Sequence, residues 1–303
     1  MATRERNDVP PPLLHPNWSR PAASAIDGFS IEVTAKDAGQ LPALAPRIPA
    51  ETPIAIAYLP NEAMPARVEA ARIVRDLGFE PMPHFSARRI ESRDAFETYL
   101  AAVTDRAGVR RCFVVAGDPA TPAGPFADSA SLIATGAFEQ SGIRAIGVGG
   151  HPEGHPNMTV DQSFAVLESK CGEIERRGMA PLIVTQFGFD ADAVIRWLEQ
   201  LRARGIDVPV RLGVPGPAGI KTLLRYAAVC GVGASTAVLR KYGLSLTALV
   251  GSAGPDRFVA ALEDTLASCG PVRLHFYPFG GLARTLDWID DYARNLGPDE
   301  GQQ

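Results

Sequence analysis

Cysteine is scarce in this sequence, and the few cysteines stand far apart. The 303 residues contain four, at Cys112, Cys171, Cys230 and Cys269, with no C-x-x-C pair and no cysteine–histidine cluster at metal-ligand spacing. Three of them lie inside apolar or helical runs, where a free thiol packs as a small hydrophobic group. We therefore expect neither a disulfide framework nor a metal site, and a reducing compartment such as the cytoplasm.

Long apolar runs and an excess of basic residues are missing as well. No stretch approaches the ~18–20 apolar residues of a membrane span, and residues 1–11 lack the apolar core of a signal peptide. The net charge is −4, so no basic face indicates binding to nucleic acid or to an anionic membrane. The sequence predicts a cytoplasmic protein without nucleic-acid or membrane partners, and it leaves a homo-oligomer open.

A glycine-rich phosphate loop is absent at the place where an open, doubly wound sheet would carry it. The first predicted strand, 29–33, is followed by Thr34-Ala35-Lys36-Asp37 and not by G-x-G-x-x-G. What the chain does contain, from Gly28 onward, is a regular alternation of short apolar runs with amphipathic stretches. Strands are predicted at 29–33, 54–58, 79–84, 111–116, 143–148, 182–187, 208–214 and 272–277, and helices at 63–77, 93–107, 128–140, 162–177, 190–204, 219–229 and 256–268.

Eight strand–helix units in about 250 residues predict a closed (β/α)₈ TIM barrel, with the open sheet as its competitor. We expect the barrel over residues 28–297, a proline-rich N-terminal arm over 1–27 and a polar tail over 298–303. The segment 234–250 is longer than one connection needs, which predicts one or two additional helices there.

Polar residues stand at the predicted carboxyl ends of the strands, where a barrel of this kind places its active site. They are Glu32, His84, Gly117-Asp118, the run 149–155, Gln186, His275 and Tyr277. Glu32 lies between two β-branched apolar residues, and burial there would raise its pKa and suit it to act as a general acid. The alternative is an outward-facing carboxylate paired with an arginine.

Two of these side chains have competing interpretations. Gln186 ends the apolar run 182–184, and its amide requires hydrogen-bond partners, either from a ligand with a donor and an acceptor edge or from a neighbouring loop. Asp118 follows Gly117 in a loop after the fourth predicted strand, a usual place for a ligand contact. An Asx turn or a helix cap ahead of Pro119 is the other interpretation.

The loop at 151–156 contains two histidines four residues apart. On a helix this spacing would indicate a metal pair, but Pro152, Gly154 and Pro156 exclude a helix between His151 and His155. A loop of this composition suits a flat or phosphorylated ligand better, and an ordinary connecting loop is the alternative. A hydrolytic metal barrel is disfavoured, because no set of carboxylates and histidines recurs at ligand spacing on one strand.

Taken together, these residues resemble the methylenetetrahydrofolate reductase family, whose flavin-bearing barrel reduces methylenetetrahydrofolate to methyltetrahydrofolate. The similarity runs from about Gly28 to Gly297 in the family's order. It is carried by Ser30-Ile31-Glu32, Pro83-His84, Gly117-Asp118, the His-Pro-Glu-Gly-His-Pro run at 151–156, Val184-Thr185-Gln186-Phe187 and His275-Phe276-Tyr277.

The resemblance implies specific roles for the residues that match. Glu32 would be the acid that opens the imidazolidine ring of the folate, and Asp118 and Gln186 would contact the folate. FAD is the implied cofactor and NADH or NADPH the reductant, with hydride passing from nicotinamide to flavin N5 and then to the methylene carbon. The residues implied to contact FAD are His84, Gly117, Asp118, His151, His155 and, at its phosphates, Lys170.

Several positions depart from the family's pattern. Ala57, Ala116 and His151 stand where the family commonly has a threonine, an arginine and an aromatic residue, and each change removes the contact that the family's residue makes to the flavin. The family's arginine after the last strand is absent from 277–281, and Arg284 is the nearest substitute. Two alternatives therefore remain open: a flavin-free reductase that passes hydride directly from NAD(P)H to folate, and a folate- or flavin-binding barrel without catalysis.

Overall fold

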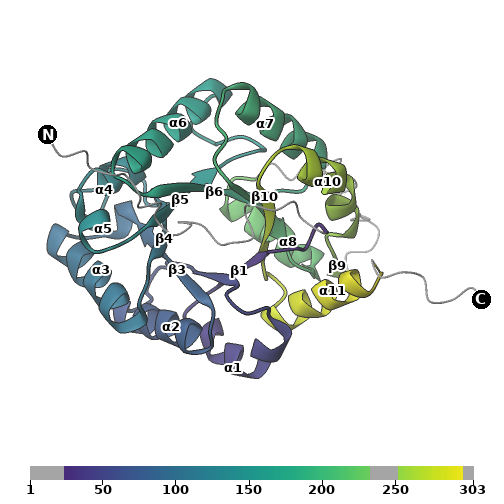
Figure 1. Cartoon of the computed structure of the whole chain (residues 1–303), viewed down its shortest axis with the longest axis horizontal. Coiled ribbons are helices and arrows are strands. Elements are labelled where there is room, and N and C mark those ends of the chain that lie inside the picture. Colours follow the sequence, from purple (N-terminus) through teal and green to yellow (C-terminus); the bar gives the residue numbers. More distant parts are fainter. Residues whose placement is uncertain (1–23, 233–251, 296–303) are drawn as a thin grey trace, which may run out of the picture.

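The computed structural model describes residues 24–232 and 252–295. Within these ranges parallel strands close into a barrel in the order β1-β10-β7-β6-β5-β4-β3-β2, which confirms the predicted (β/α)₈ fold (Figure 1). The barrel strands are β1 (Ser30–Val33), β2 (Pro53–Ile56), β3 (Glu80–Ser86), β4 (Arg111–Val115), β5 (Ala145–Gly150), β6 (Ala180–Phe187), β7 (Val210–Pro215) and β10 (Val272–Tyr277).

Helices surround the barrel because each carries one apolar face that is buried against the strands (Figure 1). The outer ring contains α2 (Met64–Asp76), α3 (Arg93–Ala107), α4 (Ser129–Ile133), α5 (Ala137–Gln140), α6 (Val160–Arg176), α7 (Ala191–Ala203), α10 (Asp256–Ser268) and α11 (Leu282–Asn295). Between β1 and β2 the chain forms η2 (Asp37–Gln40), α1 (Leu41–Leu44) and η3 (Ala45–Arg47). None of the helices in the described parts of the chain is both long and apolar enough to cross a bilayer.

Local sequence signals set the helix ends. Ser92 accepts a hydrogen bond from the Ala95 amide at 3.0 Å and begins α3, which ends at Gly108 with φ at 57°. Thr159 and Gln162 form a reciprocal capping box at the start of α6. The caps at Ser92 and Gly108 explain why the helix predicted at 93–107 agrees with α3.

The structure also differs from the prediction in places. The single helix predicted at 128–140 is wrong: α4 and α5 are separate, because the chain turns at Gly136 with φ at 81°. Neither α11 nor the short antiparallel pair of β8 (Ala218–Gly219) and β9 (Ser252–Ala253) was predicted. The extra helices predicted in 234–250, most of the arm and the tail lie outside the described residues.

Two apolar clusters fill the barrel and its surround. The larger cluster lies between the strands and the helices, where Phe85, Phe96 and Phe138 meet edge to face at 5.2–5.9 Å. The smaller one occupies the centre of the barrel and contains Ala55, Met82, Phe113, Leu182 and Val184. His84, which pairs with Phe113 across β3 and β4, lies edge-on to that ring at 4.7 Å. The polar site therefore rests directly on this inner core.

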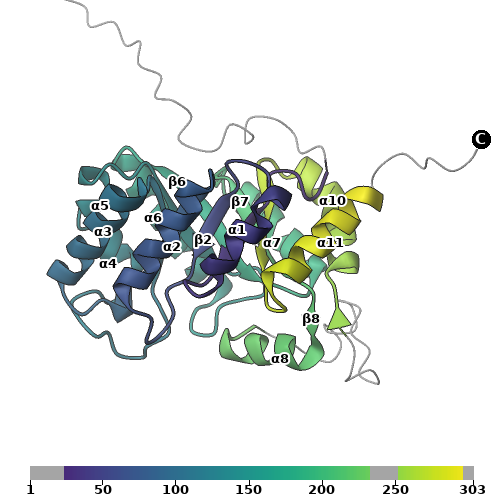
Figure 2. The ribbon, with the colours of Figure 1, turned by 90° about the horizontal axis from the view of Figure 1, so that it is seen from below.

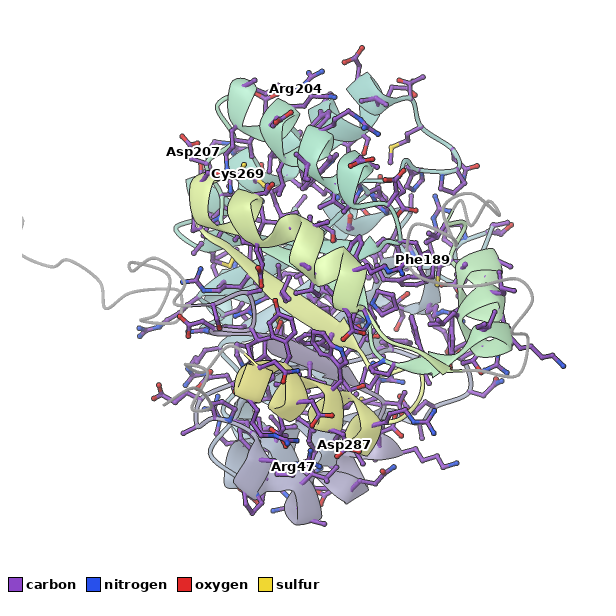
Figure 3. The ribbon with its side chains drawn as sticks, turned by 90° about the vertical axis from the view of Figure 1, so that its right-hand side faces the viewer. Arg47, Phe189, Arg204, Asp207, Cys269 and Asp287 are labelled. Carbon is purple, nitrogen blue, oxygen red and sulfur yellow. The ribbon has the colours of Figure 1, made fainter. Side chains whose placement is uncertain are left out.

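Helix α8 (Ile220–Val229) leaves the outer ring and lies at one end of the barrel (Figure 2). That end is the carboxyl end of the strands: Figure 3 places Phe189, just beyond β6, on the side of α8, and Asp207 and Cys269, which precede β7 and β10, on the other. Tyr226 of α8 stacks on Phe279 at 4.1 Å, and this contact holds the helix to the loop after β10.

Candidate active site

Strand β1 delivers Glu32 between two imidazole rings. Glu32 Oε2 lies 3.3 Å from His84 Nε2 and 3.8 Å from His275 Nε2. Both nitrogens are buried and neither has an aligned hydrogen-bond partner. His275 comes from β10, the neighbour of β1, and His84 comes from β3. The barrel thus gathers three residues from positions far apart in the sequence, each of which was predicted to be a polar residue near a strand end.

Burial controls the charge of this cluster. It raises the pKa of Glu32, and the nearby His84 opposes part of that rise. Burial lowers the pKa of His84, and it lowers the pKa of His275 to about 3, with the positive charge of Arg211 adding to the effect. The site therefore favours a protonated carboxyl beside two neutral imidazoles, which is the state that a general acid requires.

Ser30 fixes the orientation of His275. Its Oγ lies 2.8 Å from His275 Nδ1 and 3.5 Å from the Leu274 carbonyl oxygen. With the hydroxyl donating to that carbonyl, Oγ accepts from Nδ1–H, and Nε2 presents its lone pair to Glu32. No role of its own was predicted for Ser30, because its partner is 245 positions away and meets it only across the closed barrel.

Gln186 leaves the barrel ladder at a β-bulge in β6. The pairing with β7 shifts between Val184 and Phe187, so Thr185 and Gln186 together occupy the place of one residue. Thr185 satisfies the interrupted ladder, because its Oγ1 accepts from the Gly213 amide at 2.8 Å and its carbonyl accepts from Tyr277 Oη at 3.0 Å. The Gln186 side chain is partly exposed, and its Oε1 accepts from the Phe187 amide at 3.1 Å.

Glu153, which the sequence did not single out, joins the loops after β5 and β6. Its Oε1 accepts from the amides of Phe189 and Asp190, the latter at 2.8 Å. Gly188 leaves room for this carboxylate, because a Cβ there would lie 2.6 Å from Oε1 and would displace the Glu153 side chain. The same loops and the end of α8 enclose a small hollow lined by His151, Glu153, Gln186 and Cys230, among others. Glu153 could have been noticed in the sequence as the carboxylate among the glycines and prolines of 151–156.

Gly117 and Asp118 follow β4, as expected. Gly117 has φ at 89°, and a Cβ on it would collide with Ser86 Oγ, so only glycine fits. The Asp118 side chain is exposed and pairs with Arg89, whose Nη2 lies 2.7 Å from Oδ2. The structure therefore brings Asp118 to Arg89, an interaction that the sequence did not predict, and records no contact between Asp118 and Gln186.

His151, His155 and Lys170 lie on the β5 side of the site. The rings of His151 and His155 meet edge-on at 4.6 Å in a loop, which agrees with the expectation that prolines exclude a helix. His155 Nδ1 accepts from the Asn157 amide at 3.1 Å, which leaves Nε2–H as the donor in the neutral ring. Burial lowers the pKa of His151 to about 4, and the charge of Lys170 lowers the pKa of both histidines further.

Lys170 itself is half-buried. Burial lowers its pKa, with Cys171 and Asp128 acting in the opposite direction, and no hydrogen bond or ion pair reaches its ammonium group from the described residues. A half-buried cation beside neutral imidazole donors suits a phosphorylated ligand. In the described ranges no three His, Cys, Asp or Glu side chains lie close enough to hold a metal ion.

The fold and the site together define a (β/α)₈-barrel protein with a largely buried acid, Glu32, at the carboxyl end of its strands and a half-buried cation, Lys170, on the β5 side. The chain belongs to the methylenetetrahydrofolate reductase family, whose family model matches residues 59–280. This confirms the family resemblance found in the sequence.

Curated relatives agree with this membership. Methylenetetrahydrofolate reductase 1 of Schizosaccharomyces pombe is 32% identical over 139 residues, which cover 44% of this chain and 21% of that protein. Methylenetetrahydrofolate reductase 2 of Saccharomyces cerevisiae is 39% identical over 84 residues, covering 28% and 13%. Methylenetetrahydrofolate reductase (NADH) 1 of Arabidopsis thaliana is 27% identical over 176 residues, covering 53% and 29%. The matches thus span less than a third of these relatives' length.

A solved structure supports the fold alone. Dihydropteroate synthase from Thermus thermophilus superposes with a TM-score of 0.50 at 14% identity, covering 89% of this chain and 94% of that one. At this level of identity the likeness extends to the barrel architecture and not to the chemistry.

Proposed function

We propose that this protein reduces 5,10-methylenetetrahydrofolate to 5-methyltetrahydrofolate, with NADH or NADPH as reductant and FAD as bound cofactor. The observation that carries the proposal is Glu32, a largely buried carboxyl with its side chain 20% exposed, which has a raised pKa and lies between two neutral imidazoles. Family membership supports the same reaction. As a family member without a membrane-crossing helix in its described residues, the protein is expected to work in the cytoplasm.

Glu32 would supply the proton that the reaction needs. Opening the imidazolidine ring of the folate requires that the departing ring nitrogen be protonated, and a neutral carboxyl near that atom provides the proton. His84 and His275 lie beside Glu32, and as neutral rings they favour its protonated form before the proton is transferred. Ser30 keeps His275 in the tautomer that accepts a proton at Nε2.

Gln186 and Asp118 would recognise the folate. The Gln186 amide offers a donor and an acceptor at the bulge in β6, close to the hollow formed with His151 and Glu153. The Asp118 carboxylate accepts hydrogen bonds, which complements the N–H groups along one edge of a pterin ring. The two side chains together would orient the pterin without either one taking part in proton transfer.

The residues present fit FAD. The half-buried ammonium of Lys170, which has no hydrogen-bond partner among the described residues, would meet the phosphates, and His155 would donate from Nε2. Gly117 lets the chain approach a flat ring closely, and Gly149 and Gly150 leave the end of β5 without side chains. His84, Asp118 and His151 complete the proposed contacts. Bound FAD would carry hydride between nicotinamide and folate.

A visible spectrum and an activity assay test this proposal. We expect a yellow protein with flavin absorbance and NADH- or NADPH-dependent reduction of methylenetetrahydrofolate. The substitution Glu32→Gln removes the proton donor and should lower turnover by at least about 100-fold, since general acid catalysis contributes typically 10²–10⁴-fold, while FAD and folate remain bound. Turnover retained by Glu32→Gln would contradict the proposed role of the acid.

A flavin-free reductase is the second candidate, favoured by Ala57 and Ala116. Ala57 is buried at the carboxyl end of β2 and offers no hydrogen-bonding side chain to a flavin. Stoichiometric FAD in the purified protein contradicts this candidate, and a colourless protein whose activity is independent of added FAD supports it. Folate binding without turnover in the wild-type protein would instead indicate a binding barrel.

A further inference from the structure

The loop after β4 rests on the turn that follows β3, η4 (Ala87–Arg89). The Arg88 amide donates to the Ala116 carbonyl oxygen at 2.8 Å, and its guanidinium donates to the Ala127 carbonyl oxygen at 2.6 Å. Both bonds are to the main chain. Arg88 therefore sets the path of the loop that carries Gly117 and Asp118.

Arg89 makes a contact of a different kind. Its guanidinium bonds the Asp118 side chain, with 2.7 Å between Nη2 and Oδ2, and meets no other acceptor or acid among the described residues. The two partners differ in exposure: the Arg89 side chain is 19% exposed and the Asp118 side chain 78%. The protein therefore holds the cation, while the carboxylate faces outward with Oδ1 available to a ligand.

The charge of Asp118 reaches the candidate active site. Burial raises the pKa of Cys230 to about 11, and the negative charges of Glu32 and Asp118 both contribute to that rise. Cys230 lines the same small hollow as Gln186. Asp118 and Glu32 thus both act electrostatically on one thiol at the end of α8, and Asp118 follows β4 at the carboxyl end of the barrel strands, the same end at which Gln186 follows the bulge in β6.

We propose that Arg89 is a positioning residue for folate recognition, which holds the Asp118 carboxylate in one orientation so that Oδ1 accepts from the pterin N–H groups. This rests on the proposed function. Holding the carboxylate in place before the ligand arrives removes part of the ordering cost of binding. Arg89 reaches the ligand only through Asp118, so its effect on affinity disappears when Asp118 can no longer act as a charged acceptor.

A double-mutant cycle tests the proposal in the full-length, FAD-loaded protein. The variants are Arg89→Ala, Asp118→Asn and the two combined, with the dissociation constant of 5-methyltetrahydrofolate measured by isothermal titration calorimetry. We expect Arg89→Ala to weaken binding about fivefold, the upper end for a partly exposed ion pair. In the Asp118→Asn background the same change should have no further effect, and Arg89→Lys should restore part of the affinity by keeping the charge.

Arg72→Ala is the matched control. Arg72 also pairs with carboxylates, Glu69 among them at 2.7 Å, but it lies on the exposed face of α2. Both arginine variants should change the melting temperature to a similar small extent, and only Arg89→Ala should change folate affinity. A purely structural role for Arg89 would lower stability and affinity together, also in the Asp118→Asn background.

Three results would overturn the proposal, and they are distinguishable. If the wild-type protein binds folate and Arg89→Ala binds it equally well, Arg89 has no positioning role and the proposed function stands. If the wild-type protein binds no folate, the proposed function fails and this inference fails with it. Additive effects of the two substitutions would also contradict a role that acts through Asp118.

Discussion

At the scale of single residues, the pKa of Glu32 is set by the surrounding side chains and by its burial. An ionised carboxylate in a poorly solvated site costs several kcal/mol unless a positive partner or a set of donors compensates. The two neighbouring imidazoles are themselves held neutral by burial, so they offer little positive charge. The remaining route is for the carboxyl to keep its proton, and this moves the loss of that proton to a higher pH.

The raised pKa of Glu32 predicts how stability depends on pH. Because the folded protein holds this proton more tightly than the unfolded chain, whose pKa is near 4.5, wild-type stability falls as pH rises from that value through the raised one. Glu32→Gln carries no such penalty, so its melting temperature minus that of the wild type should increase between about pH 5 and 8. Thermal unfolding followed by circular dichroism measures the difference.

Glu69→Gln is the control for this measurement. Glu69 is exposed on α2, and its hydrogen bond to Arg72 lowers its pKa, so its effect on stability is already complete above about pH 5. The difference in melting temperature between Glu69→Gln and the wild type should therefore stay flat from about pH 5 to 8. A difference for Glu32→Gln that stays flat or decreases with rising pH would show that the buried carboxyl is ionised in the folded protein.

Sequence reasoning reached some of these residues and not others, for a physical reason. Glu32 was identifiable because its flanking residues, Ile31 and Val33, predict burial of the strand that carries it. Arg89 and Glu153 act on residues of other loops, 29 and 37 positions away in Asp118 and Asp190. No local pattern encodes such pairs, because the barrel creates them by placing loops side by side.

At the scale of elements, the bulge in β6 decides where Gln186 lies. Two residues occupy one place in the ladder, so the strand needs a substitute for the lost main-chain bond, and Thr185 Oγ1 supplies it to Gly213. An apolar run read from sequence predicts the strand but not this insertion. The Thr185 hydroxyl therefore stabilises the bulge that positions the Gln186 amide.

Replacing Thr185 by valine tests this dependence. The substitution keeps the shape but leaves the buried Gly213 amide without a partner, which should lower the free energy of unfolding by about 1–3 kcal/mol. Thr104→Val is the control, because the Thr104 hydroxyl donates to helix carbonyls such as that of Leu100, which already accept within α3. Urea denaturation of both variants measures the two costs, and equal costs would mean that the hydroxyl does not support the bulge.

The helices divide into those with strong local signals and those without. α3 agrees with its prediction because Ser92 and Gly108 terminate it at both ends. The single helix predicted at 128–140 was wrong because the helical spacing of apolar residues continues across Gly136, although the positive φ of Gly136 ends the helical backbone there. α11 carries apolar residues at Leu282, Leu286 and Ile289, all buried, so this helix was predictable from its period although it was not predicted.

At the scale of the whole molecule, cofactor binding should raise the stability of the barrel. A ligand that binds only the folded chain adds about 2.7 kcal/mol at a concentration 100 times its dissociation constant. We therefore expect excess FAD to raise the melting temperature by several degrees. Lys170→Ala should reduce this shift, because it removes the half-buried cation proposed to meet the phosphates.

Riboflavin and Lys36 provide the controls. Riboflavin has no phosphate, so its shift should be the same in the wild type and in Lys170→Ala. Lys36 is exposed in the loop after β1, and its replacement by alanine should leave the FAD shift unchanged. If FAD produces no shift in the wild type, the flavin-free candidate is favoured.

The pairing of β1 with β10 makes the acidity of Glu32 depend on closure of the barrel. Ser30 and His275 meet only where the first and last strands of the barrel join, so a chain in which these strands have not met leaves Glu32 in water with ordinary acidity. Contacts between such distant parts of a chain form slowly. Proton donation by Glu32 therefore depends on complete closure of the barrel. A molecule in which every helix has formed but β1 and β10 have not paired would show a helical circular dichroism spectrum and would not turn over substrate.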